Sequence, residues 1–260
     1  MKLESLEIEI KGKKYQFLDT QTGNPAILFI HGLGSNKDIM PKIFEPFLEK
    51  YRCIFIDLPS HNKIPYYEID TLDEIGEYVV NFIHGIHLNN FTLIGFSFGG
   101  VVAIQTQKML EQEGIKVKAV AWASPLRRDF LTMRAKSFLA IVDSLNKKFY
   151  KKLPKSGIFK LVVALLGIKA KNSELESFTF FENNNLDKFQ KMIPAKFIGT
   201  ENREVLYLFG TKDPLINNSA FKKTVINKDY QSKYLIKNGG HYYDKKGREE
   251  ALEYIKKFLG

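Results

Sequence analysis

Short apolar runs alternate with amphipathic segments along much of the chain. Four runs are predominantly apolar, as expected for strands that are covered on both faces of a sheet. These runs are Ala26–Ile30, Cys53–Asp57, Phe91–Gly95 and Val117–Ala123. Segments with helical periodicity follow the first three of them, over Ile39–Lys50, Thr71–Leu88 and Phe98–Glu113. This alternation predicts a parallel sheet whose strands are joined by right-handed helical crossovers.

The N-terminal segment has the pattern of a β-hairpin. Residues Leu3–Ile10 alternate between apolar and polar, and a Lys-Gly-Lys turn leads into the second strand, "KYQFL". This pattern predicts a hairpin at the edge of the sheet. The helix predicted after Thr71 has a capping box, because Glu74 stands three residues after this N-cap threonine.

The alternation stops at Pro125 and resumes at the strands Glu204–Gly210 and "SKYLI", followed by a helix over Arg248–Leu259. Between these parts only helical patches occur. We therefore predict one α/β domain, residues 1–124 and 197–260, with a helical cap inserted at residues 125–196. The predicted sheet has eight mostly parallel strands with helices on both faces.

The net charge of +10 is concentrated in the middle of the chain. Residues 125–200 contain 15 Lys and Arg but only 6 Asp and Glu, so they carry +9. No nucleic-acid-binding motif or aromatic stacking pattern accompanies this charge, and no nucleic-acid partner is expected. The charge belongs either to solvated helix faces or to a positive field around the site that the insertion covers.

Other features of the composition indicate a soluble, cytoplasmic protein. The single cysteine, Cys53, excludes an internal disulfide. The N-terminus lacks the pattern of a signal peptide. The longest dense apolar stretch, Ile158–Ile168, is far shorter than the ~18 residues of a membrane span, so no stable membrane insertion is expected.

The stretch Gly95–Gly99 reads Gly-x-Ser-x-Gly and stands between a predicted buried strand and a helix. A sharp turn there brings neighbouring segments close together, and the glycines remove the collisions. Ser97 is then exposed at the tip of the turn, at the N-terminus of the helix. The serine is a candidate nucleophile, provided that a base removes its proton.

His241 and Asp213 are the candidates for the base and for the acid that orients it. Each follows a strand of the C-terminal part, so both belong at the carboxyl edge of the sheet, as does Ser97. Asp57 and Asp129 are alternative acids, and Asp213 could instead, or in addition, be a helix N-cap.

With the chain order Ser97, Asp213, His241, the sequence resembles the α/β-hydrolase family. Along the whole chain the family motifs appear in order as "HGLGS", "DLPSH", "GFSFGG", "FGTKDPLI" and "GGH". The resemblance implies the α/β-hydrolase fold and a catalytic triad of these three residues. One departure is the loop after Asp57, where many relatives have glycine in place of Ser60 and Asn62, so the shape of this loop is expected to differ.

The resemblance also implies the rest of the site. The backbone N–H groups of Leu33 and Phe98 would form the oxyanion hole, and His31, Gly32 and Phe96 would contribute to substrate binding. No metal cluster and no Gly-rich phosphate loop is present in the sequence, so we expect no cofactor.

These features predict a serine hydrolase of the carboxylesterase type that cleaves esters of small to medium acyl chains. An alternative is a thioesterase or methyl-ester esterase whose acyl group arrives on an acidic carrier, such as acyl-carrier protein or coenzyme A, attracted by the basic insertion. A ligand-binding relative without catalysis is a further alternative, and so is a lipase acting at an anionic membrane surface.

Overall fold

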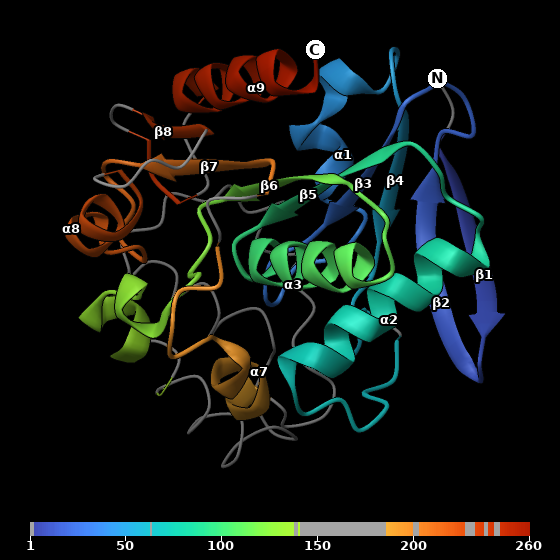
Figure 1. The fold of residues 1–260 in the computed structure, drawn as a ribbon, viewed down its shortest axis with the longest axis horizontal. Coiled ribbons are helices and arrows are strands. Elements are labelled where there is room, and N and C mark those ends of the chain that lie inside the picture. The colour runs from blue at the N-terminus through green and yellow to red at the C-terminus, as the bar shows by residue number, and fades with distance from the viewer. Residues whose placement is uncertain are drawn as a thin grey trace, which may run out of the picture.

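The described strands form an eight-stranded sheet in the order β1-β2-β4-β3-β5-β6-β7-β8 (Figure 1). The computed structural model describes residues 3–62, 64–137, 140, 186–199, 203–226, 232–236, 239–241 and 245–260. The strands are β1 (Glu4–Ile10), β2 (Lys13–Asp19), β3 (Ala26–Ile30), β4 (Arg52–Ile56), β5 (Phe91–Phe96), β6 (Lys118–Trp122), β7 (Val205–Gly210) and β8 (Ser232–Ile236). Strand β2 pairs antiparallel with both β1 and β4, and the remaining pairs are parallel. The predicted mostly parallel sheet is confirmed.

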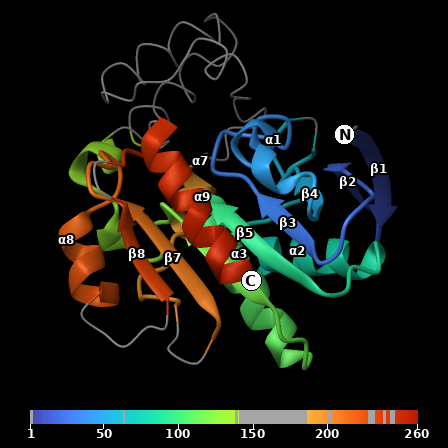
Figure 2. The same ribbon diagram turned by 90° about the horizontal axis from the view of Figure 1, so that it is seen from above.

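Helices cover both faces of this sheet (Figures 1 and 2). The α-helices are α1 (Met40–Ile43), α2 (Leu72–Gly85), α3 (Phe98–Gln112), α7 (Leu186–Met192), α8 (Asn218–Phe221) and α9 (Lys245–Leu259). Short 3₁₀ turns η1 (Glu45–Phe47) and η2 (Arg128–Phe130) and a π-helical turn η3 (Lys222–Ile226) are also present among the described residues.

Strand β3 shows how the side chains divide between the two faces. All five of its residues are buried. Leu28 and Ile30 pack in the core with α2 and α3, whereas Ile27 and Phe29 pack in a second core with α1 and α9. Because successive side chains of a strand point to opposite faces, a continuous apolar run is what a strand between two helical layers requires.

The predicted hairpin at the edge of the sheet is confirmed. Strands β1 and β2 are joined by Lys11 and Gly12, which both have positive φ angles, of 51° and 72°. Two central residues with positive φ give the turn type whose twist matches that of the flanking strands. Exposed polar residues alternate with partly buried apolar ones along β1, so charged side chains protect this edge strand.

The prediction of one helix over Ile39–Lys50 is wrong, because it is longer than the helix that forms. Only the short α1 and the 3₁₀ turn η1 form there. Pro46 lies in this turn, and a proline ring removes a backbone donor and collides with the preceding helical turn. By contrast, α2 begins at Thr71 with the predicted capping box, in which Glu74 takes part.

The predicted cap, residues 125–196, lies mostly outside the described residues. Its two described ends are joined through Arg128. The backbone N–H of Arg128 donates to the Pro194 carbonyl at 2.8 Å, and its Nε donates to the Ile193 carbonyl at 3.1 Å. In the part of the chain that the structure describes, none of the helices has the length and apolar character needed to span a membrane.

Candidate active site

Ser97 occupies a strained turn between β5 and α3. Its φ of 53° and ψ of −121° lie in a region that non-glycine residues rarely adopt. The turn is held by the Ser97 N–H, which donates to the Trp122 carbonyl at 2.8 Å. A Cβ on Gly95 would lie 2.2 Å from the Gly99 oxygen, and one on Gly99 would lie 2.1 Å from the Ile30 oxygen. The two glycines of the motif therefore provide the space in which this turn fits.

A chain of hydrogen bonds connects Ser97, His241 and Asp213. The Ser97 Oγ lies 3.1 Å from His241 Nε2, and His241 Nδ1 lies 2.8 Å from Asp213 Oδ2. Because a carboxylate only accepts, Nδ1 carries the proton of the neutral imidazole and Nε2 is left to accept from the serine hydroxyl. The histidine and aspartate are buried, with 5% and 6% exposure, and the serine is partly exposed.

The two carboxylate oxygens of Asp213 have separate partners. Oδ2 faces His241, while Oδ1 accepts from the N–H groups of Leu215 and Ile216 at 2.8 and 3.1 Å. A helix capped by Asp213 would start at Pro214, but the next helix, α8, begins later, at Asn218. Asp213 thus caps a turn rather than a helix, and this turn fixes its orientation toward the histidine.

The loops that carry the acid and the histidine are bonded to each other. The Lys212 N–H donates to the Gly239 carbonyl at 2.9 Å. The ring of Phe96 is buried between Trp122 and His241, at centroid distances of 5.9 and 5.3 Å. Phe96 therefore packs behind the imidazole, and its predicted contact with substrate stays a prediction.

The two alternative acids lie in other surroundings. Asp57 is fully buried and accepts from the Lys37 N–H at 2.7 Å and from Asn62 Nδ2 at 2.9 Å, and the Lys37 ammonium lies 3.3 Å away. Burial raises the pKa of this carboxyl, and Lys37 and Asn62 oppose that effect. Asp129 forms a half-exposed ion pair with Arg127. Of the three candidate acids, Asp213 is the one that the structure brings to His241.

The residues predicted to bind the oxyanion lie in two segments beside Ser97. Phe98 is the first residue of α3, where N–H groups have no partner within the helix. Leu33 follows Gly32 in the loop after β3, and a Cβ on Gly32 would lie 3.0 Å from the Ser97 Cβ. The loop thus passes close to the serine, and a larger residue at position 32 would press on it.

His31, predicted to bind substrate, is fully buried. Its Nε2 accepts from the Leu58 N–H at 3.0 Å, and its Nδ1 donates to the Gly32 carbonyl at 2.8 Å. Burial, mainly, lowers the pKa of His31 to about 4, with a smaller contribution from the Lys37 charge. Both ring nitrogens have main-chain partners, and substrate contact by this residue stays a prediction.

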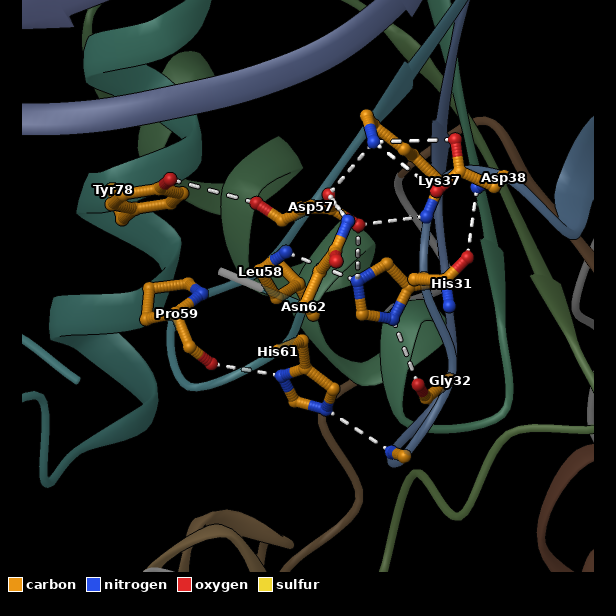
Figure 3. A network of polar contacts seen from close by, with 12 residues as sticks. His31, Gly32, Lys37, Asp38, Asp57, Leu58, Pro59, His61, Asn62 and Tyr78 are labelled. Carbon is orange, nitrogen blue, oxygen red and sulfur yellow. Dashed lines mark hydrogen bonds and ion pairs between the residues drawn. The ribbon is translucent and has the colours of Figure 1, made fainter. Parts of the chain in front are cut away.

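His61, in the loop after β4, is also fully buried. Its Nδ1 donates to the Pro59 carbonyl at 2.8 Å, and its Nε2 accepts from the Gly34 N–H at 3.1 Å. Burial and the neighbouring His31 lower the pKa of His61 to about 3. Figure 3 shows the two imidazoles next to each other in this polar network.

The loop after β4 adopts a conformation that glycine would favour at two positions. Ser60 and Asn62 have φ angles of 62° and 55°, in the left-handed region. Asn62 is one of the residues that tolerate this region, and its side chain bonds Asp57. The loop therefore has a glycine-like backbone at two positions that are not glycine.

The sequence did not predict that Phe189 of α7 lies next to the candidate site. Its ring is fully buried, with centroids 5.5 Å from His61 and 5.7 Å from Phe98. The position lies in the predicted cap, in a stretch of sequence that is mostly polar, so its pattern did not indicate a buried ring. A signal for His61 did exist, because adjacent parallel strands bring the loops that follow them together.

The chain resembles hydrolases over nearly its whole length. It is 23% identical over 247 residues to the "Putative esterase/lipase 2" of Mycoplasma genitalium, covering 90% of this chain and 88% of that protein. Two of the solved structures that share its fold cover nearly all of the chain. One is E-2-(acetamidomethylene)succinate hydrolase, with a TM-score of 0.76 and 15% identity, covering 99% of both chains. The other is a "putative lipase" from Acinetobacter baumannii AYE, with a TM-score of 0.72 and 18% identity, covering 98% of this chain and 92% of that one.

Residues 27–245 match the sequence profile of the alpha/beta hydrolase family. This span starts within β3 and includes the strands β4–β8 and the loops that carry Ser97, Asp213 and His241. The protein therefore belongs to the alpha/beta hydrolase family.

Proposed function

We propose that this hydrolase is a serine esterase that cleaves carboxylic esters of small to medium acyl chains. The observation that carries the proposal is the hydrogen-bonded chain from Ser97 through His241 to Asp213, with distances of 3.1 and 2.8 Å. The names of the Mycoplasma protein, an esterase/lipase, and of the Acinetobacter protein, a lipase, agree with an ester substrate. Ser97 acts as the nucleophile, His241 as the base and Asp213 as the residue that orients the base.

In the proposed mechanism, Ser97 Oγ attacks the carbonyl carbon of the ester while its proton passes to His241 Nε2. The imidazolium that forms is stabilised by Asp213 Oδ2, whose position is fixed by its turn. Negative charge develops on the carbonyl oxygen and is bound by the N–H groups of Leu33 and Phe98. One such donor typically contributes about 3 kcal/mol to stabilising the transition state.

The tetrahedral intermediate then collapses, and the C–O bond to the alcohol breaks. His241 Nε2 returns the proton to the leaving alkoxide, so that an acyl-Ser97 ester and a free alcohol remain. Water enters the same site, gives a proton to His241 and attacks the acyl carbon. The bond to Ser97 Oγ then breaks, and Oγ takes the proton back from His241 Nε2, which releases the carboxylic acid and restores both the serine hydroxyl and the neutral imidazole.

The test is hydrolysis of p-nitrophenyl acetate and p-nitrophenyl butyrate by the wild type and by Ser97→Ala. We expect the wild type to be active and the variant to lose about 10⁴-fold or more in kcat, because it lacks the nucleophile. A fluorophosphonate probe should label the wild type at Ser97.

The matched control is Ser5→Ala, at an exposed position on the edge strand β1, which should keep the wild-type rate. Hydrolysis that survives in folded Ser97→Ala, or labelling at another residue, would contradict the proposed function.

A second candidate is hydrolysis of an acyl ester or thioester that arrives on an acidic carrier, either acyl-carrier protein or coenzyme A. The observation that favours it is the net charge of +9 on residues 125–200. A basic surface attracts a polyanionic carrier over distances of several ångströms and increases the rate of encounter.

A further inference from the structure

Two loops that follow neighbouring strands are joined by reciprocal hydrogen bonds, in which a histidine of each loop accepts from a backbone N–H of the other. We define the donor loop as residues 31–37, after β3, and the brace loop as residues 57–62, after β4. His31 of the donor loop accepts from the Leu58 N–H of the brace loop. In return, His61 of the brace loop accepts from the Gly34 N–H of the donor loop. Each loop thus holds the backbone of the other (Figure 3).

The bonds to carbonyl groups fix the protonation of both rings. The Nδ1 atoms of His31 and His61 lie 2.8 Å from the carbonyls of Gly32 and Pro59. Nδ1 must therefore donate and Nε2 must accept, which is possible only in the neutral imidazole. The rings lie edge to face, with centroids 4.8 Å apart.

These bonds surround the peptide that carries the Leu33 N–H. The Gly32 carbonyl belongs to that same planar peptide unit, and it accepts from His31 Nδ1 and, at 3.1 Å, from the Ser35 N–H. The next N–H along the chain, that of Gly34, donates to His61. The direction of the Leu33 N–H is thus set by bonds on both sides of it.

His61 also reaches the segment of Phe98 through an aromatic contact. Phe189 packs with centroids 5.5 Å from His61 and 5.7 Å from Phe98, and its side chain is fully buried. His61 therefore touches His31 on one side and Phe189 on the other. Through these neighbours it connects the two backbone segments that carry the Leu33 and Phe98 N–H groups.

We propose that His61 is a positioning residue. It fixes the position of the Leu33 N–H relative to the Phe98 N–H, through its bond to Gly34 and its packing against His31 and Phe189. The inference rests on the proposed function, because the two N–H groups matter as donors to an oxyanion. A displacement of about 1 Å in such a donor is enough to cost about 100-fold in rate.

The test compares His61→Leu, which removes both ring nitrogens, with His61→Gln, whose Oε1 can replace the Nε2 acceptor. With p-nitrophenyl butyrate, we expect His61→Leu to lower kcat about 10- to 100-fold and to change KM less than about twofold. Binding of a trifluoromethyl ketone, which forms an oxyanion on Ser97, should weaken by the same factor. His61→Gln should recover most of kcat and of inhibitor affinity.

His84→Leu and His84→Gln are the matched controls, because His84 is exposed on α2, and both should keep wild-type kinetics. Folding of each variant is checked by circular dichroism. If His61→Leu does not fold, His61→Gln is compared with His61→Asn, whose shorter side chain does not reach Gly34. The glutamine variant should then be about 10-fold faster.

Wild-type kcat in folded His61→Leu, or equal rates for the glutamine and asparagine variants, would overturn the inference while leaving the esterase assignment intact. An inactive wild type that no fluorophosphonate labels would instead contradict the proposed function.

Discussion

At the residue scale, His31 and His61 are two imidazoles that the fold keeps neutral and buried. Burial is the main cause that lowers their pKa values, to about 4 and about 3. An unfolded chain restores the ordinary value of about 6.5 for each. Between these values the unfolded state binds more protons than the folded state, so the unfolding free energy rises with pH across that window.

We therefore predict that the part of the unfolding free energy that depends on the neutral His31 and His61 is complete above about pH 6.5. This part is lost as the pH falls toward 4. The slope contributed by each histidine is up to about 1.4 kcal/mol per pH unit. Asp57 has the opposite effect on the pH dependence of the unfolding free energy, because burial raises the pKa of its carboxyl. Urea unfolding of the wild type and of His61→Gln between pH 4 and 8 isolates the contribution of His61.

The glutamine variant should show a shallower dependence between pH 4 and 6, whereas His84→Gln should follow the wild type. Equal slopes for His61→Gln and the wild type would show that His61 is not held neutral by the fold.

The sequence alone predicted that Ser97, Asp213 and His241 lie together, because motif, chain order and position after a strand all point to them. It did not identify the contacts of His61, which stands in a loop without periodicity. Its partner Gly34 lies 27 residues earlier, and the bond between them depends on how two loops cross. Such a pairing is set by tertiary structure, and no local pattern records it.

At the element scale, the turn from β5 into α3 depends on close contact between backbones. A Cβ on Gly99 would lie 2.1 Å from the Ile30 oxygen and 2.5 Å from the His31 oxygen, and backbone atoms cannot move aside as a flexible side chain can. By contrast, a Cβ on Gly240, beside His241, would meet no atom within 4 Å in the described structure.

We predict that Gly99→Ala lowers the unfolding free energy by about 3 kcal/mol or more and abolishes ester hydrolysis, because the added methyl group overpacks the turn. Gly240→Ala should keep both stability and activity close to the wild type. Thermal unfolding and p-nitrophenyl butyrate assays measure the two effects. A fully active and stable Gly99→Ala would refute this account of the turn.

Buried strands and long amphipathic helices were predictable, since their patterns extend over many residues. Element boundaries near proline were not: α1 ends after four residues, and α8 begins after Asn217 rather than at Pro214. Asn217 caps α8 by accepting from the N–H groups of Ser219 and Ala220. At α8 this local hydrogen-bonding preference prevailed over apolar periodicity, and at α1 the proline of the next turn did.

At the scale of the whole molecule, the excess positive charge and the proposed catalytic residues lie in different parts of the chain. Residues 125–200 carry +9 of the total +10, whereas Ser97, Asp213 and His241 lie outside this span. A carrier attracted by these basic residues would therefore affect encounter with the enzyme rather than the chemical step.

If the substrate arrives on acyl-carrier protein or coenzyme A, kcat/KM on the carrier-bound ester should fall at least tenfold between about 20 and 300 mM salt, because screening weakens long-range attraction. The same salt series with neutral p-nitrophenyl butyrate is the control and should give a nearly constant rate. A carrier-bound substrate that is insensitive to salt would argue against the carrier proposal and leave the simple ester as substrate.

The backbone contacts of Arg128 have a consequence for how this protein can diversify. They join residues on either side of a long inserted segment, so the two ends of that segment are fixed to each other at the surface of the domain. The entropy of closing a loop between fixed ends grows only slowly with its length. A change in the length of the segment between these ends therefore costs the domain little stability, provided that the buried Phe130 and Phe189 are kept. This position can accept longer or shorter segments while the turn of Ser97 stays as it is.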